Sequence, residues 1–306
     1  MPAKDANECL IKGLGKAAYK ALAFNAQEVK KSRLVFGESL HSSAREQAQF
    51  GELSWPWGHL NKATRGIRYG ETIYIGAGTK MGKSEIVNAL ASHFITEHGV
   101  KILLAKPEEA NNKTYKLLCS KVVGKVFHDP NIEFDYEAYD RAGEELGGHV
   151  AMLDLYQHLG WESLKLDILE SIAWGCKAIF IDPITNLTSG VESSEANVLL
   201  QSVSQELSII AKDNSVVFFI FCHLNAPKTG DDHQNGGKVH STQFTASRSM
   251  MRSCNLMIGM QGNKDPELPK SERNMRELVI LEDREFGASG VFPLFWEEST
   301  GLFNEM

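Results

Sequence analysis

The sequence lacks paired cysteines, a long apolar run and an excess of basic residues, and each absence excludes a class of protein. Its five cysteines are an odd number and include no CxxC pair, so we expect neither a disulfide framework nor a zinc site. The longest apolar run, Val216 to Cys222, is far shorter than the about 20 residues of a membrane-spanning helix. No apolar stretch of signal-peptide type stands near the N-terminus. These absences predict a protein of a cytosol-like compartment with no membrane partner.

The charge balance is acidic, because 32 Lys and Arg residues stand against 39 Asp and Glu, a formal net charge of −7. This balance excludes a protein that coats nucleic acid with a broadly basic surface, although a local basic lining on an acidic body remains open. With 42% hydrophobic residues in a chain of 306, an ordinary globular core can form. We therefore expect a folded protein for which nucleic acid remains open as a partner.

The order of apolar and polar segments predicts an α/β fold over residues 55–306, preceded by a helical arm over residues 1–54. From Trp55 onward, short apolar strands alternate with helices, which is typical of a mostly parallel twisted sheet flanked by helices. The last two expected strands follow each other directly and predict a C-terminal antiparallel hairpin turned at Phe286–Gly290. The expected strands are Thr72–Ile75, Lys101–Ala105, Val150–Leu153, Ala178–Ile181, Val216–Cys222, Leu256–Met260, Glu277–Leu281 and Val291–Trp296, and the expected helices are Lys83–His98, Asn112–Lys125, Trp161–Trp174 and Ala196–Asp213.

A glycine-rich turn follows the first expected strand and leads directly into a helix. It has the pattern of a phosphate-binding loop with Ala where the first Gly usually stands, and consists of Ala77, Gly78, Thr79, Lys80, Met81, Gly82, Lys83 and Ser84. In such a loop, backbone N–H groups and the helix N-terminus bind phosphate, the lysine reaches the β and γ oxygens, and the hydroxyl binds Mg²⁺. Because the strand before and the helix after it supply the required context, we predict that this turn binds a nucleoside triphosphate.

Further polar residues stand where expected strands end, which is where ligands bind in open α/β sheets. Asp182 ends one apolar strand and is expected to bind Mg²⁺, with a helix N-cap as the alternative role. Glu108 is the expected general base, with its neighbour Glu109 as the alternative base and a solvated acidic turn as the plainer interpretation. His223 ends another buried strand and is expected to sense the γ-phosphate, the alternative being a structural histidine.

Arg284 lies in the segment Leu281–Gly287 on the expected final hairpin. We expect its strand to lie at the far end of the sheet from the P-loop strand, so that the side chain cannot reach the phosphates of its own subunit. Such an arginine fits a finger that stabilises charge on the γ-phosphate of a neighbouring subunit. The alternative is a rim salt bridge with Glu282 or Glu285.

The motifs occur in an order and spacing that resembles the replicative ring helicases of the DnaB family, which have a RecA-like P-loop fold. The nearest resemblance is to the helicase part of the bifunctional primase-helicases of short-tailed phages and to their mitochondrial relative Twinkle. It covers residues 55–306, and because Lys4–Leu10 resembles the end of a Toprim primase domain, residues 1–54 are expected to be the end of a primase region plus a linker arm. The motifs that carry it are Leu60–Glu71, Ala77–Ser84, Leu104–Glu109, Phe180–Asp182, Phe221–Leu224 and Ile280–Gly287.

The resemblance implies a hexameric ring that encircles single-stranded DNA, hydrolyses ATP or dTTP with Mg²⁺, moves 5′ to 3′ and unwinds a replication fork. It also implies a primase and a replicative polymerase as partners, and a phage protein in the cytoplasm of a bacterial host, with the mitochondrial matrix as the second choice. One alternative is a RecA- or KaiC-like ATPase that assembles on DNA or protein without unwinding. Another is a nucleotide-gated scaffold with negligible turnover.

The resemblance also assigns roles to residues. Lys83 and Ser84 would bind phosphate and Mg²⁺, Asp182 would bind Mg²⁺, Glu108 would be the base, His223 the γ-phosphate sensor and Arg284 the finger in trans. Trp296 falls where the family often places a residue against the nucleotide base, with core packing as an equal alternative. The segment after His223 falls where the family lines its channel, so its DNA contacts are expected from Lys228, Lys238 and Arg248. Glu282 departs from the family, which commonly has Lys there.

Overall fold

The computed structural model describes residues 3, 6–17, 37–45, 47, 49–154, 160–227, 229–244 and 252–306. The chain divides into two compact units, Met1–Gln49 and Phe50–Met306. In the first unit, the described helices are α1 (Ala6–Ile11) and α3 (Gly37–Ala44). Residues 18–36 of the predicted arm lie outside the described residues. The assignment of this unit to a primase tail and a linker remains a prediction.

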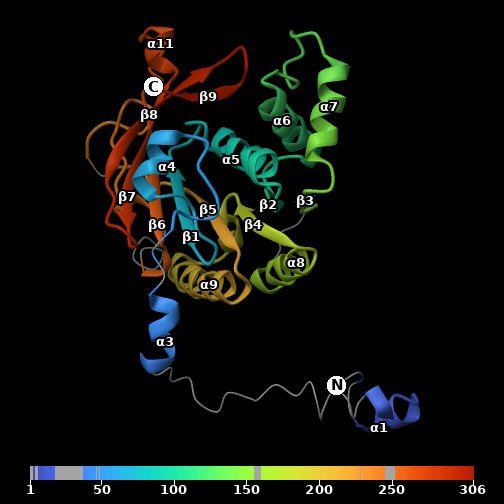
Figure 1. Cartoon of the computed structure of the whole chain (residues 1–306). Helices are drawn as coiled ribbons and strands as arrows, with labels where there is room; N and C mark the ends of the chain where they lie inside the picture. Colours follow the sequence, from blue (N-terminus) through green and yellow to red (C-terminus); the bar gives the residue numbers. More distant parts are fainter. Residues whose placement is uncertain are drawn as a thin grey trace. The chain divides into compact units, whose positions relative to one another are not determined.

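The second unit is built on one nine-stranded sheet with the order β3-β2-β4-β5-β1-β6-β7-β8-β9 (Figure 1). Neighbours from β3 to β6 pair in parallel, whereas β7, β8 and β9 each pair antiparallel with the preceding strand. The predicted α/β fold with a C-terminal hairpin is therefore confirmed. The strands are β1 (Thr72–Ala77), β2 (Lys101–Ala105), β3 (Val150–Met152), β4 (Cys176–Ile181), β5 (Val217–His223), β6 (Leu256–Gln261), β7 (Met275–Asp283), β8 (Gly290–Glu297) and β9 (Leu302–Glu305).

Helices cover both faces of the parallel part of the sheet, as Figure 1 shows for α5 on one side and α8 and α9 on the other. Strands buried on both faces are apolar along their whole length, which is why β1, β4 and β5 stand out in the sequence. Phe94 of α5 packs with Phe180 and Phe219 on one face. The helices are α4 (Gly58–Thr64), α5 (Lys83–His98), α6 (Asn111–Val123), α7 (Tyr136–Leu146), α8 (Trp161–Ala173), α9 (Ser193–Asn214) and α11 (Lys270–Arg273).

Helix α7 and strand β9 have no counterpart among the predicted elements. Helix α7 is rich in charge and buries only Ala138, Ala142 and Leu146, which lie four residues apart on one face. Its start is fixed by Asp135, whose side chain accepts a hydrogen bond from the backbone N–H of Ala138 at 2.9 Å. No helix in the described ranges is long and apolar enough to cross a membrane.

Different residues lie at the two edges of the sheet where its parallel strands begin and end. At the carboxyl edge, where the parallel strands end, Ala77 of β1 lies opposite His223 of β5, and Ala105 of β2 lies opposite Ile181 of β4. At the amino edge, where the parallel strands begin, Leu256 of β6 lies opposite Asp283, the last residue of the antiparallel strand β7. Residues after β1 and β4 therefore gather at one edge, and residues after β7 at the other.

Candidate active site

The phosphate-binding loop has the predicted local structure, a turn between β1 and the long helix α5. Helix α5 begins at Lys83, and its N-cap residue Gly82 has a φ of 102°, a left-handed conformation that favours glycine. The first N–H groups of α5 have no partner within the helix, and the helix dipole adds positive potential at this end. The turn therefore presents backbone donors and a lysine together, as an anion site requires.

One cavity of about 340 Å³ at the carboxyl edge brings together Lys83, Glu108 and His223, three of the predicted catalytic residues, and Asp182. Lys83 Nζ lies 2.7 Å from Asp182 Oδ1 in an ion pair and 3.5 Å from His223 Nε2. His223 Nε2 in turn lies 3.6 Å from Glu108 Oε2. Four side chains from four separate segments thus surround one space. The residues that line it are Gly78, Thr79, Lys80, Gly82, Lys83, Ser84, Glu85, Lys106, Glu108, Glu109, Asp182 and His223.

The neighbouring acids Glu108 and Glu109 have different surroundings. Glu109 has a side chain only 13% exposed and binds Lys106 Nζ at 2.5 Å, Lys113 Nζ at 3.0 Å and the Thr114 hydroxyl at 2.9 Å. Burial alone would raise the pKa of Glu109, but Lys106 and the hydrogen bonds lower it to about 2. The Glu108 side chain is 51% exposed and faces the cavity. Glu108 is therefore the acid that can meet a water molecule there, while Glu109 secures the turn.

The oxygens of Ser84 and Asp182 fit a magnesium ion. Both residues line the cavity, and a hydroxyl with a carboxylate offers the hard oxygen ligands that Mg²⁺ prefers. The Asp182 side chain is only 5% exposed and pairs with Lys83. A metal–nucleotide complex could bind here if it replaced the pairing of this carboxylate with Lys83.

Arg284 lies outside this cavity, at the amino edge of the sheet. The expectation that its strand is far from β1 in the sheet order is wrong, since only β6 separates β7 from β1. The separation instead runs along the strands, because β7 is antiparallel to β6 and ends where β1 begins. The six residues of β1 correspond to about 20 Å at the usual rise per residue.

Trp296 lines a second cavity of about 420 Å³ that adjoins the same turn through Lys80, Met81 and Gly82. Its ring also packs on Phe303, with 4.9 Å between the ring centroids. Both predicted roles of Trp296 therefore have a structural basis, since the residue lines a space next to the P-loop and contributes to the core.

Three residues that the sequence did not single out hold the P-loop from outside. His233 is only 5% exposed, and a Cβ added to Gly78 would lie 2.5 Å from the Cβ of His233. Lys264 Nζ donates to the carbonyl of Lys80 at 3.0 Å, and Arg276 Nε donates to the carbonyl of Met81 at 2.8 Å. Burial lowers the pKa of both Lys264 and Arg276. Contacts to backbone carbonyls leave no pattern in a sequence, so only the three-dimensional packing reveals these residues.

The expected DNA-binding residues are only partly described. Lys238 is exposed, on a segment whose backbone is held to the loop after β6 by a hydrogen bond from Lys264 N–H to the carbonyl of Gln234 at 2.7 Å. Lys228 and Arg248 lie outside the described residues. The assignment of DNA contacts to this segment remains a prediction.

The parallel sheet, the P-loop and the acids at its carboxyl edge define a P-loop nucleotide-binding protein of RecA-like fold. Residues 54–305 match the model of the DnaB-like helicase C terminal domain, and the chain belongs to that family. The family predicted from the ordered motifs is thereby confirmed.

Comparison with individual proteins agrees with this membership. The chain is 29% identical over 311 residues to a DNA helicase/primase of Enterobacteria phage T3, a match that covers 95% of this chain and 52% of the relative. The chain thus spans about half the length of that curated relative. Among solved structures, a DnaB-like replicative helicase studied with its primase interactions has a TM-score of 0.71 at 14% identity, over 97% of this chain and 72% of the other. An ATPase domain has a TM-score of 0.68 at 15% identity over 99% of each chain.

Proposed function

We propose that the chain is the motor part of a replicative DNA helicase, a ring of six subunits that hydrolyses nucleoside triphosphate, moves 5′ to 3′ on single-stranded DNA and unwinds a fork. The observation that carries the proposal is the meeting of Lys83, Asp182, Glu108 and His223 in one cavity, with Arg284 at the opposite edge of the sheet. A site complete except for its arginine is suited to an assembly in which a neighbour supplies that group. Membership of the DnaB-like family supports the same conclusion.

In this proposal, the P-loop and Lys83 position the triphosphate. The backbone donors of the turn bind the β-phosphate, and Lys83 exchanges its pairing with Asp182 for the phosphate oxygens. Ser84 and Asp182 would hold Mg²⁺, which neutralises the charge of the phosphates when bound. Charge neutralisation and positioning account for most of the catalysis of phosphoryl transfer.

Glu108 acts as the general base towards the attacking water. Its exposure to the cavity supports this role, whereas the two lysines at Glu109 keep that carboxylate occupied. His223 lies between Lys83 and Glu108, within 3.6 Å of each, which suits a residue that registers whether the γ-phosphate is present. Arg284 completes the site of the adjacent subunit by stabilising charge on the transferred group.

The remaining assignments follow the family resemblance. Trp296 lies against the nucleotide base, of ATP or dTTP, in the cavity next to the P-loop. Lys228, Lys238 and Arg248 contact DNA in the central channel. A primase and a replicative polymerase are proposed partners, in the cytoplasm of a phage-infected bacterial host.

The proposal is tested by phosphate release and by strand displacement on a forked duplex. Lys83→Ala should abolish both activities, while the control Lys62→Ala, at an exposed position of α4, should retain them. Hydrolysis that depends on Lys83 but displaces no strand would favour a RecA- or KaiC-like ATPase. Near-normal hydrolysis by Lys83→Ala would overturn the assignment of the P-loop.

A further inference from the structure

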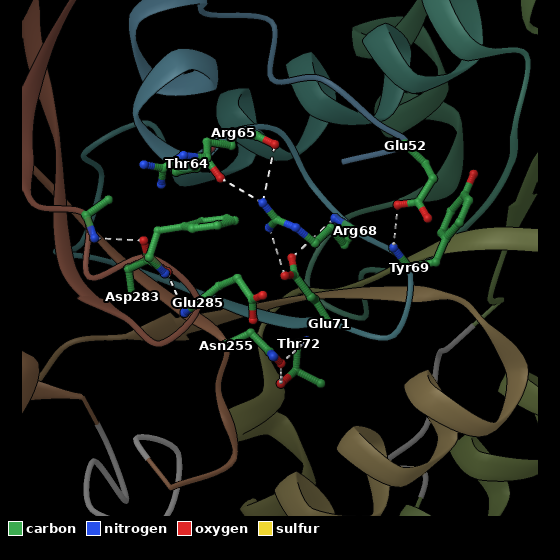
Figure 2. Close-up of polar contacts among 12 residues, drawn as sticks. Glu52, Thr64, Arg65, Arg68, Tyr69, Glu71, Thr72, Asn255, Asp283 and Glu285 are labelled. Carbon is green, nitrogen blue, oxygen red and sulfur yellow. Dashed lines mark hydrogen bonds and ion pairs between the residues drawn. The ribbon is translucent and has the colours of Figure 1, made fainter. Parts of the chain in front are cut away.

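The turn that carries Arg284 is fixed by contacts made within it. The Asp283 carboxylate accepts three backbone N–H groups, from Glu285 at 3.0 Å, Phe286 at 3.3 Å and Ala288 at 2.8 Å. Figure 2 labels Asp283 and Glu285 in this turn. One side chain thus satisfies three of the backbone donors of this short loop. Hydrogen bonds to a charged acceptor are stronger than those between neutral groups, so the backbone on both sides of Phe286 is well defined.

The same turn is attached to the strand that ends in the P-loop. The backbone N–H of Arg284 donates to the carbonyl of Asn255 at 3.0 Å. The side-chain Oδ1 of Asn255 accepts the N–H of Thr72, the first residue of β1, at 3.0 Å (Figure 2). The backbone of the arginine is therefore held on one side by the sheet.

On its other side, the turn meets two arginines through the ring of Phe286. The guanidinium carbons of Arg65 and Arg68 lie 4.1 and 4.6 Å from the centroid of this ring. Both distances are within the range of cation–π attraction. Arg65 follows helix α4 and Arg68 lies three residues further on, so this contact joins the turn to a segment that precedes β1.

Arg68 is itself firmly held, which makes it a rigid platform for the ring. Its Nη1 donates to Glu71 Oε1 at 3.0 Å and its Nη2 to the carbonyl of Thr64 at 3.1 Å (Figure 2). Burial raises the pKa of Glu71, with hydrogen bonds from Arg68 opposing the rise and Glu285 adding to it. The ring of Phe286 therefore lies against a prearranged set of charges.

We propose that Phe286 is a positioning residue for Arg284, whose ring, held against Arg65 and Arg68, fixes the turn in the conformation that presents the arginine to a neighbouring subunit. The inference rests on the proposed role of Arg284 in trans. Gly287 and Gly290 flank the rest of the loop with positive φ angles and give it little stiffness of their own. Without the ring contact, the turn would be held only by its internal hydrogen bonds and on the side of the sheet, and misplacement of a catalytic group lowers kcat.

The test compares Phe286→Leu, which keeps an apolar side chain but removes the aromatic face, with Phe286→Tyr, which keeps that face. We expect Phe286→Leu to lower kcat of hydrolysis about 5- to 30-fold, as expected for the loss of cation–π contacts, with little change in KM. Phe286→Tyr should retain most of the wild-type kcat. The control Phe50→Leu, at a side chain 63% exposed and distant in sequence, should leave kcat unchanged.

Two further measurements separate positioning from general stability. Phe286→Leu subunits mixed with Lys83→Ala subunits should regain hydrolysis, since the mixture pairs an intact P-loop with an intact arginine turn. Arg65→Gln should lower kcat about 2- to 5-fold. Because Arg65 is exposed and does not contribute to the core, the melting temperature should stay close to that of the wild type.

The outcomes distinguish this inference from the function on which it rests. If Arg284→Ala hydrolyses at the wild-type rate, the role of Arg284 in trans fails. If Arg284→Ala is inactive while Phe286→Leu and Arg65→Gln keep the wild-type kcat, the positioning role of Phe286 is overturned. A Phe286→Tyr variant as slow as Phe286→Leu would overturn it too, because the aromatic face would then have no part in the effect.

Discussion

At the scale of single residues, Glu108 and Glu109 show how two adjacent carboxylates acquire different roles. We expect Glu108→Gln to slow hydrolysis about 10²- to 10⁴-fold while nucleotide binding is kept, since general-base catalysis contributes about that factor. Glu109→Gln should instead destabilise the fold, because it leaves the buried ammonium of Lys106 without its carboxylate. Phosphate release, nucleotide affinity and thermal melting of both variants distinguish the catalytic role from the structural one. The opposite assignment, a catalytic loss in Glu109→Gln alone, would show that Glu109 is the base.

The contact between Gly78 and His233 gives a second prediction at this scale. Gly78→Ala would place a Cβ 2.5 Å from the Cβ of His233, so the P-loop or the histidine segment must move. We expect a loss of about 1–3 kcal/mol in unfolding free energy, the usual cost of overpacking, and weaker nucleotide binding.

Chemical denaturation and nucleotide titration measure these two effects of Gly78→Ala. Gly160→Ala is the matched control, because no described residue other than its chain neighbours lies within 4 Å of a Cβ added there. The double variant Gly78→Ala, His233→Gly should recover part of both losses. Equal stability of Gly78→Ala and Gly160→Ala would mean that His233 does not constrain the P-loop.

At the scale of elements, the end of helix α5 carries a pH-sensitive contact. The backbone N–H of Ser54 donates to His98 Nε2 at 3.0 Å, and the Ser54 hydroxyl lies 3.0 Å from His93 Nε2. Burial lowers the pKa of both histidines below 6.5, His98 adds to this effect at His93, and Glu97 opposes it at both. The folded state therefore keeps them neutral, whereas the unfolded chain takes up protons near pH 6.5.

It follows that the stabilising contribution of these histidines is full above pH 6.5 and is lost as the pH falls through their lowered folded-state pKa values. We expect the free energy of unfolding to decline as the pH falls below 6.5, and to decline less in the double variant His93→Gln, His98→Gln. Denaturant melts across this range measure the slope. Identical slopes in the double variant and the wild type would assign the decline to other groups.

The elements that the sequence predicts well are those buried on both faces. Strands β1, β2, β4 and β5 and helix α5 agree with the predicted ranges to within a few residues, because continuous apolar runs and the P-loop mark them clearly. The sequence could predict that Asp182 and His223 lie in the site, because each stands at the end of a parallel strand and the carboxyl ends of parallel strands meet at the same edge of the sheet. The location of Arg284 was misjudged because strand order and strand direction depend on pairing between distant segments, which one sequence does not display.

At the scale of the whole molecule, DNA binding should depend on salt although the chain carries a net charge of −7. Each phosphate contact with single-stranded DNA contributes about 0.7 to the slope of log K against log salt. Replacing Lys228 and Lys238 together by Ala should flatten that slope, whereas Lys62→Ala should not. Affinities measured with a labelled single strand at several salt concentrations provide the test. An unchanged slope in the double variant would move the DNA contacts to another part of the chain.

Assembly should be visible in mixtures of inactive subunits. Arg284→Ala subunits and Lys83→Ala subunits, each inactive alone, should regain hydrolysis when combined, because some interfaces then pair an intact P-loop with an intact arginine. An arginine finger contributes about 10³- to 10⁵-fold to the rate where one acts. The mixture is assayed with and without DNA, since basal turnover depends less on a full ring. Absence of recovery in both conditions would contradict a role in trans.

Strand β1 begins beside the anchor of the arginine turn and ends in the P-loop. In the proposed ring, strand β1 thus sets the distance between two active centres. One is the P-loop site of the subunit itself, and the other is the neighbouring site to which the subunit contributes Arg284. Lengthening or shortening a surface loop changes contacts locally, but a one-residue insertion in β1 would disturb the pairing of this central strand with β5 and β6, because side chains alternate between the two faces of a sheet. The spacing of successive centres around the ring therefore depends first on the backbone of the sheet, and the contacts of Phe286 fix the arginine turn at the end of that backbone.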